Sequence, residues 1–353
     1  MGYDKKNLSV NENVFFTVDG GEITAWNYET RQKFIISLAG FKCLINPKDS
    51  PTNTVDTLHA KGLLIARSRL KGKSWRWDIF SKIFHFGTML RRQEVKSSDA
   101  IQESQAYLNY CAMIMPSMPS DAFMTTRGSG GIALRKIKPP SRLTSFLRLL
   151  EDRRTNRTFT GQTLQWSSIS LILDEAFKYR EHDLRAYDSK GIWTPTKRRS
   201  SPSAGALQTC EAYLIARNVG EIQSGIYHYR SHLQNLGRIQ DLPEDFSFGE
   251  LLGGQMFADD LSAVIVITGR FDKLMWKYKQ SRSYRVALFD AGHLSQTTQL
   301  LATGLGVRTW PTAAFYDDEL SELLLLTNEH NEYPLLVIGL GTGPNNPFDR
   351  DID

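Results

Sequence analysis

The alternation of hydrophobic and polar positions predicts a small mixed unit within residues 13–70. Residues 14–27 contain two short apolar stretches around a pair of glycines, a pattern that predicts a β-hairpin. Residues 34–45 and 55–60 carry apolar side chains at helical spacing, and residues 63–65 predict a closing strand. Strands, helices and a closing strand within so short a length are typical of a winged-helix-like module.

The middle of the chain follows a less regular pattern. Residues 75–90 are rich in aromatic side chains and predict a helix, whereas the polar residues 91–104 predict a linker. A glycine-rich stretch at 128–131 interrupts the chain again. We therefore expect three segments: a winged-helix-like module at 1–72, a helical and linker region at 73–145, and a larger domain at 146–353.

Helices that alternate with buried strands are predicted for the larger domain. Helical spacing of apolar residues predicts helices at 144–151, 167–179 and 286–304. Apolar runs predict strands at 212–216, 225–229, 263–268 and 335–339. Either Ser167 or Ser168 can cap the second helix, and the continuous apolar run at 263–268 indicates a strand buried on both faces. This order of elements indicates an α/β or α+β domain.

Composition narrows the class of protein without assigning a function. The 353 residues are 41% hydrophobic and 23% charged, as in globular domains, which excludes a disordered chain. A net charge of +5 is too small to indicate nucleic-acid binding, and three widely spaced cysteines predict reduced thiols. No apolar run reaches the length of a membrane span, and the N-terminus lacks the apolar core of a signal peptide. We therefore expect a cytoplasmic protein with neither nucleic acid nor membrane as a partner.

Three arginines within five residues form the first candidate site. Arg153, Arg154 and Arg157 follow a predicted helix, and their planar guanidiniums can clamp a phosphate dianion. Thr155 adds a hydroxyl donor. The alternative interpretation is a solvated basic face.

Small residues form a second candidate site at Pro202, Ser203, Ala204 and Gly205. Side chains of this size let the backbone approach a flat ligand closely, although the same residues also suit an ordinary loop. The basic run 197–199 that precedes them is expected to be a solvated loop rather than a contact for acidic peptide residues.

Lys277 and Tyr278 form a third candidate site after the strand predicted at 263–268. A lysine beside a tyrosine can supply an acid/base pair, because partial burial and neighbouring cations can lower the pKa of the lysine and cations can lower that of the tyrosine. The alternative is a charged surface loop. His85 and His293 are single histidines of predicted helices, and we expect both to be packed and hydrogen-bonded in the core.

Several common site motifs are absent from the sequence. There is no glycine-rich dinucleotide motif, phosphate-binding P-loop, His-Glu-x-x-His zinc motif or Gly-x-Ser-x-Gly nucleophile motif. We therefore expect no metal centre and no hydrolase of the α/β type.

Five motifs occur together in a characteristic order. They are Arg-Arg-Thr-x-Arg-x-Phe (153–159), Arg-Arg-x-x-Pro-Ser-Ala-Gly-Ala-Leu (198–207), Gly-Ile-Tyr-His-Tyr (225–229), Trp-Lys-Tyr-x-x-x-Arg-Ser-Tyr-Arg (276–285) and Asp-Ala-Gly-His-Leu (290–294). In this order the chain resembles the SagB-type branch of the nitroreductase superfamily over residues 146–345. Phe84-His85-Phe86 resembles a short motif upstream of the catalytic domain in this branch.

The resemblance implies an α+β fold, with a dimeric nitroreductase-like FMN domain at 146–353 behind the small N-terminal domain. Arg153, Arg154, Thr155 and Arg157 would hold the FMN phosphate and ribityl chain. Pro202, Ser203, Ala204 and Gly205 would line the isoalloxazine ring, with Gly304 and Gly306 close to the flavin. Lys277 and Tyr278 match the Lys-Tyr pair that is linked to catalysis in azoline oxidases.

The function implied is an FMN-dependent dehydrogenase that oxidises thiazolines and oxazolines in a ribosomally made precursor peptide, with dioxygen reoxidising the flavin. Residues 1–72 resemble the PqqD-like peptide-recognition modules of peptide-modifying enzymes, and cyclodehydratase partner proteins and a homodimer are expected. The alternatives are an NAD(P)H-dependent nitroreductase or flavin reductase, and a non-catalytic scaffold that binds peptide.

Overall fold

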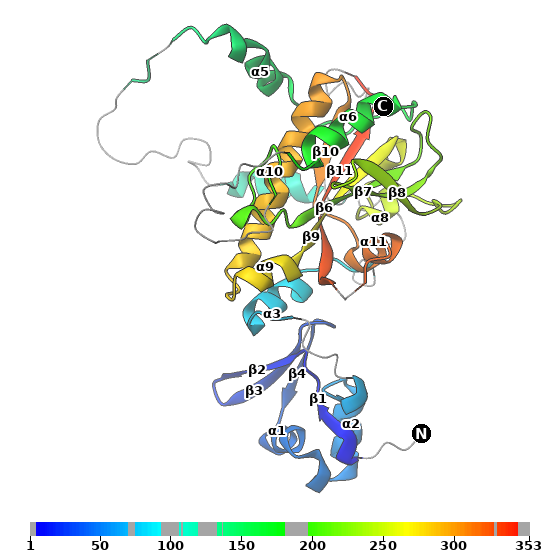
Figure 1. Ribbon diagram of the computed structural model, residues 1–353. Helices are drawn as coiled ribbons and strands as arrows, with labels where there is room; N and C mark the ends of the chain where they lie inside the picture. Colours follow the sequence, from blue (N-terminus) through cyan, green and yellow to red (C-terminus); the bar gives the residue numbers. More distant parts are fainter. Residues whose placement is uncertain are drawn as a thin grey trace, which may run out of the picture. The chain divides into compact units, whose positions relative to one another are not determined.

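The computed structural model describes residues 5–69, 75–92, 106, 109–118, 133–135, 137–180, 197–327 and 330–344 (Figure 1). The chain divides into two compact units. The first comprises residues 1–89 and 275–284, and the second comprises residues 90–274 and 285–353. The glycine-rich stretch at 128–131 and most of the linker predicted at 91–104 lie outside the described residues.

Short strands and helices build the first unit. Its elements are β1 (Leu8–Val10), β2 (Val14–Asp19), β3 (Glu22–Asn27), β4 (Gln32–Ile36), α1 (Leu38–Ile45), α2 (Thr52–Ala60), β5 (Leu64–Ala66) and α3 (Ile79–Gly87). Strands β2, β3 and β4 form an antiparallel sheet, and β1 pairs with β5. The predicted hairpin is confirmed, because Val14 lies opposite Asn27 across β2 and β3.

Two helices of the first unit begin later than predicted, and in both cases a cap sets the start. The helix predicted at 34–45 begins at Leu38, because Ser37 Oγ accepts a hydrogen bond from the Gly40 N–H at 3.1 Å. Residues 34–36 belong to β4 instead. The helix predicted at 75–90 begins at Ile79, where Asp78 Oδ1 accepts from the Phe80 N–H at 3.1 Å.

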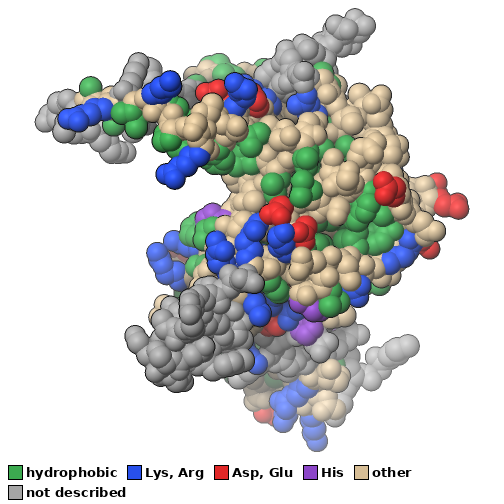
Figure 2. Space-filling model, turned by 45° about the horizontal axis from the view of Figure 1, so that its top comes forward, with side chains coloured by type: hydrophobic (Ala, Val, Ile, Leu, Met, Phe, Trp, Pro, Cys, Tyr) green, Lys and Arg blue, Asp and Glu red, His purple; other side chains and the backbone are tan. Residues whose placement is uncertain are grey.

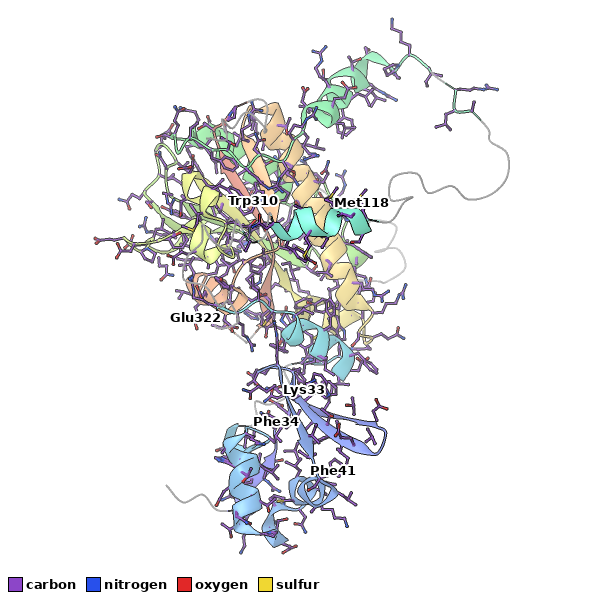
Figure 3. The ribbon with its side chains drawn as sticks, turned by 180° about the vertical axis from the view of Figure 1, so that it is seen from behind. Lys33, Phe34, Phe41, Met118, Trp310 and Glu322 are labelled. Carbon is purple, nitrogen blue, oxygen red and sulfur yellow. The ribbon has the colours of Figure 1, made fainter. Side chains whose placement is uncertain are left out.

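A six-stranded antiparallel sheet forms the centre of the second unit. Its order is β10 (Arg308–Thr312), β11 (Glu332–Gly341), β9 (Ala263–Arg270), β6 (Cys210–Ala216), β7 (Gly225–Arg230) and β8 (Asn235–Gln240). The four strands predicted in this region are confirmed, whereas β8 and β10 were not predicted. Strand β10 contains Pro311, which an edge strand tolerates because one side of its backbone needs no partner. Its Trp310, labelled in Figure 3, is buried.

Helices cover both faces of this sheet. They are α6 (Trp166–Phe177), α8 (Phe248–Leu251), α10 (Ser283–Gly304) and α11 (Asp317–Leu323), and the short α9 (Phe271–Lys277) follows β9. Helix α5 (Ser141–Asp152) precedes them in the chain and has no buried residue. Ile265 and Ile267 pack in the core with α6 and α10, whereas Val264 and Val266 pack with α8 and α11. The continuous apolar run in β9 is therefore buried on both faces, as predicted, and the predicted α+β class is confirmed (Figure 1).

Other predictions hold in part. Helix α6 begins at Trp166 after Gln165, so neither Ser167 nor Ser168 is its N-cap. The three cysteines are free thiols, as expected. Within the described ranges, no helix combines the length and apolar character that crossing a bilayer requires. On the face drawn in Figure 2, basic side chains lie next to acidic ones at several points.

Candidate functional site

The arginine cluster lies on an extended segment directly after α5. Thr155 forms a parallel bridge with Thr309 at the start of β10, and the Asn156 N–H donates to the Thr309 carbonyl at 2.9 Å. The Asn156 side chain also donates to the Pro344 carbonyl at 3.3 Å. These bonds bring the arginines close to Arg308, a basic residue that sequence reasoning missed. Only the pairing of this segment with β10 identifies it.

The charges of this cluster fit a bound phosphate. Arg153 is half-buried and Arg154 is exposed, and neither guanidinium forms an ion pair with a carboxylate in the part of the chain that the structure describes. Arg154 Nη1 donates instead to the carbonyls of Glu151 and Arg153. Glu151 and Asp152 directly precede the cluster, and the planar donor groups of Arg153 and Arg154 suit a phosphate dianion.

The two predicted glycines lie at the end of α10. A Cβ atom on Gly304 would come within 3.4 Å of the Leu149 side chain, so α5 packs closely against the last turn of α10. Gly306 follows with a φ of +73°, a left-handed conformation that suits glycine. The structure therefore brings Gly304 next to the helix from which the arginine cluster extends.

A buried carboxylate holds the loop of small residues. Ser203 Oγ donates to Asp290 Oδ2 at 2.6 Å, the Ala204 N–H donates to Oδ1 at 3.3 Å, and Thr209 Oγ1 donates to Oδ2 at 3.2 Å. Asp290 is 3% exposed, and burial raises the pKa of its carboxyl, although the bonds from Ser203 and Ala204 oppose that rise. Asp290 therefore joins the loop to α10.

The backbone of this loop is strained. Ala206 and Gln208 have φ values of +53° and +49°, and Gly205 has +58°. For residues other than glycine this conformation costs about 1–2 kcal/mol each, so the bonds around the loop must impose its shape. Asp290 was noted in the sequence only as part of the Asp-Ala-Gly-His motif. Its role as the anchor becomes visible only when the loop and α10 are seen together.

The two histidines differ from each other. His293 is exposed on α10, so the expectation that it packs in the core is wrong. Its carbonyl accepts a hydrogen bond from Ser201 Oγ at 3.4 Å. His85 is buried and bonded to Tyr284, as expected.

A group of buried charges lies under the loop. Arg199 is 2% exposed and donates to the carbonyls of Phe177 and Cys210 and to Ser231 Oγ at 2.7–2.8 Å. The predicted solvated loop at 197–199 is therefore wrong for Arg199, while Lys197 and Arg198 are exposed. Burial also raises the pKa of Cys210 to about 12, which keeps this thiol protonated and unreactive.

Glu211 and Lys273 add a second support for the loop. Lys273 Nζ lies 2.6 Å from a Glu211 carboxylate oxygen and donates to the Gln208 carbonyl at 3.2 Å. Burial alone would raise the pKa of Glu211, but His228, Lys273 and Arg199 together lower it to about 2. The ionised carboxylate thus fixes the lysine that holds the left-handed residue Gln208.

Lys277 and Tyr278 lie at the end of α9 and directly after it, in the first compact unit. Lys277 is exposed and Tyr278 is half-buried, with the lysine Nζ 5.8 Å from the centre of the tyrosine ring. The Tyr278 carbonyl accepts a hydrogen bond from Trp77 Nε1–H at 2.7 Å. Sequence reasoning placed this pair in the segment 146–353, whereas its contacts group it with residues 1–89.

One hollow in the second unit lies elsewhere. It has a volume of about 450 Å³ between α6 and the β7–β8 hairpin, and Trp166, Asp174 and Leu236 are among its lining residues. The Tyr229 hydroxyl donates to Asp174 within it at 2.9 Å. Its lining includes no residue of the arginine cluster or of the small-residue loop.

Comparison with known proteins shows to which family the chain belongs. Residues 150–342 match the model of the nitroreductase family. The chain is 29% identical over 193 residues to the protein MJ1384 of Methanocaldococcus jannaschii, which covers 55% of this chain and 88% of that protein.

Two further relatives are processing proteins of peptides. The chain is 28% identical over 114 residues to the trifolitoxin-processing protein TfxB of Rhizobium leguminosarum bv. trifolii, covering 31% of each chain. It is 31% identical over 151 residues to the microcin B17-processing protein McbC of Escherichia coli, covering 40% of this chain and 53% of McbC. The chain therefore matches about a third and about half of the lengths of these two relatives.

A solved structure shows the same fold. It is the E. coli microcin synthetase McbBCD complex with truncated pro-MccB17 bound, in which one chain matches with a TM-score of 0.53 and 20% identity. The match covers 75% of this chain and 92% of that chain.

Proposed function

Because the chain belongs to the nitroreductase family, as a SagB-type member, we propose that it is an FMN-dependent dehydrogenase that oxidises azoline rings in a ribosomally made peptide. One observation carries this proposal: the chain is similar in sequence to two peptide-processing proteins within the family region. The thiazoline or oxazoline rings of the peptide would become thiazoles or oxazoles.

The arginine cluster is the proposed phosphate site of the cofactor. Arg153, Arg154, Thr155 and Arg157 would hold the phosphate and ribityl chain, with Arg308 beside them. The absence of an acidic partner for Arg153 and Arg154 among the described residues supports this assignment. Pro202, Ser203, Ala204 and Gly205 would line the ring, because their loop is held in one shape and carries no bulky side chain.

Oxidation of an azoline removes a proton from one ring carbon and a hydride from its neighbour. When bound, FMN supplies the hydride acceptor, with dioxygen as the terminal oxidant. Tyr278 or Lys277 would take the proton, and the other residue of the pair would tune it. The lysine nitrogen lies 5.8 Å from the centre of the tyrosine ring, so the two side chains are close neighbours.

We propose that a second copy of the chain completes the FMN domain. Helix α5 has no buried residue, although it carries Leu143, Phe146 and Leu150, which are 41–47% exposed. Phe289 on α10 is 62% exposed. Apolar faces of this size normally pack against a partner, and here a homodimer would supply it.

We also propose that residues 1–72 bind the precursor peptide and that cyclodehydratase proteins act with this chain. The sheet β2-β3-β4 has edge strands at β2 and β4, and an extended peptide can add to such an edge.

The test combines cofactor loading with a defined substrate. The purified protein is expected to release FMN on heating, and the loaded protein is expected to lower the mass of an azoline-containing peptide by two hydrogens per ring under air. The variants Lys277→Ala and Tyr278→Phe should bind FMN and lose most of the turnover. NADPH oxidation without any peptide turnover would favour a nitroreductase or flavin reductase, and a colourless protein that cannot be loaded with FMN would favour a scaffold.

A further inference from the structure

Three side chains of the segment around α3 contact the Lys-Tyr segment at regular intervals. Tyr278, Ser281 and Tyr284 are the contacted positions, spaced three residues apart from the end of α9 into the first turn of α10. Their partners come from residues 77–85, about 200 positions away in the sequence. All of these residues belong to the first compact unit.

The first contact is a buried indole bonded to the backbone of the pair itself. Trp77 is 5% exposed, and its Nε1–H donates to the Tyr278 carbonyl at 2.7 Å. The indole also packs edge-on against the rings of Trp75 and Tyr284, with centroids 6.0 and 6.4 Å away. A tightly packed ring with a single N–H fixes both the position and the direction of the carbonyl it serves.

The second contact ties the start of α3 to the turn. Ser281 Oγ lies 2.8 Å from Ser81 Oγ and also bonds to the Asp78 carboxylate. Ser81 is buried, and its hydroxyl accepts a bond from Trp75 Nε1–H at 3.1 Å. The residue that caps α3 therefore also holds the middle of the turn.

The third contact fixes the far end of the turn. His85 Nδ1 and the Tyr284 hydroxyl are 2.9 Å apart, and both residues are buried. The ring of Trp75 stacks on His85 at 5.2 Å. Tyr284 lies in the first turn of α10, so this bond fixes the C-terminal end of the Lys-Tyr segment.

We propose that Trp77, Ser81 and His85 are positioning residues, which hold the backbone of residues 278–284 so that Lys277 and Tyr278 keep one orientation. The proposal rests on the proposed function insofar as this pair carries the proton transfer. The Phe84-His85-Phe86 motif and the aromatic residues before it take no part in the arginine cluster or the small-residue loop, and the proposal gives them a role. Packing alone would need only apolar side chains, whereas these three contacts are directional hydrogen bonds.

The test compares Trp77→Phe with Trp26→Phe in the full-length protein. Trp26 also donates its indole N–H, to Thr17 Oγ1 at 3.1 Å in the β2–β3 hairpin, so its variant removes an indole bond away from the Lys-Tyr segment. It serves as the control for the exchange measurement alone, which contains no peptide. Ser81→Ala serves as a second variant that leaves every large side chain in place.

Two readouts are measured. Amide hydrogen exchange of residues 278–284, recorded without peptide, should become about tenfold faster in Trp77→Phe and Ser81→Ala and stay unchanged in Trp26→Phe. In azoline oxidation, kcat should fall on the order of 10- to 100-fold while KM and the FMN dissociation constant change less than about twofold.

Each outcome decides one question. Unchanged exchange and unchanged kcat in both Trp77→Phe and Ser81→Ala would overturn the positioning role. Loss of kcat together with loss of FMN or a general rise in exchange would also overturn it, since the effect would then be on folding. If the wild-type protein oxidises no azoline, the proposed function fails, and the exchange measurement still decides whether these residues hold the segment.

Discussion

The buried histidine of the first unit makes its stability depend on pH. His85 is 4% exposed, and burial lowers its pKa from 6.5 to about 3. In the unfolded chain His85 therefore takes up a proton below about pH 6.5, whereas in the folded unit the same ring stays unprotonated until about pH 3. This histidine stabilises the fold fully above its unfolded pKa, and that contribution is lost as the pH falls towards the folded value.

The size of the effect follows from the pKa difference. A pH of 5 lies about 1.5 units below the unfolded pKa of the histidine, so the unfolded chain is almost fully protonated at this residue. The free energy of unfolding should therefore fall by about 2 kcal/mol relative to pH 7. Burial causes the lowered pKa of His85, whose ring lies 2.9 Å from the Tyr284 hydroxyl and packs against the rings of Trp75 and Phe86.

Urea unfolding of the full-length protein at pH 7 and pH 5 measures this loss, with the combined fluorescence of the seven tryptophans as the signal. The variant His85→Gln carries no charge at either pH, so its loss should be smaller than that of the wild type by about 2 kcal/mol. Equal losses in the two proteins would show that protonation of His85 does not cause the pH dependence. An NMR titration of the wild-type His85 ring gives an independent answer, since a midpoint near 6.5 would exclude the burial effect.

The remaining predictions concern the second unit. Arg153→Ala should weaken FMN binding by about 10- to 100-fold in a fluorescence titration, because a charge-assisted bond is lost, while Arg198→Ala on the exposed run should leave it unchanged. Asp290→Ala removes the acceptor of three bonds, including that of Ser203, and should lower the free energy of unfolding by about 2–3 kcal/mol in urea; equal stability would contradict its anchoring role. Glu211 has a pKa of about 2 in the folded protein, so its ionised carboxylate should contribute about 3 kcal/mol to the free energy of unfolding. This contribution should be complete above pH 4.5 and be lost as the pH falls towards 2. In acid unfolding curves, Glu211→Gln should abolish this dependence.

Local patterns account for most of the secondary structure. The run at 263–268 is apolar at every position except its last, and such a strand is stable only between two covered faces, which is how β9 lies. Errors occurred where a single polar contact set a boundary, as at Ser37, whose side chain starts α1 and leaves residues 34–36 to a strand. They also occurred at β10, where Pro311 hides the strand in the sequence and the edge position makes it possible.

In the candidate site, too, some residues could be predicted from the sequence and others could not. The arginines, the small-residue loop and the Lys-Tyr pair were found from the sequence, because the residue types themselves carry the chemistry. Which groups support them was not visible there. The bond from Ser203 to Asp290 spans 87 positions, and that from Trp77 to Tyr278 spans 201. Nothing in the neighbouring sequence of either residue indicates its partner.

The residue pattern predicts the order of most elements and the residue types that suit a phosphate, a flat ring and a proton transfer, and the family resemblance implies the α+β class. The folded chain alone shows which charged side chains are buried, as for Arg199, and which elements support the Lys-Tyr segment. Secondary structure follows from periodic burial and capping within a few residues, whereas the burial of a charge and the direction of a hydrogen bond depend on groups that folding brings together from distant parts of the chain.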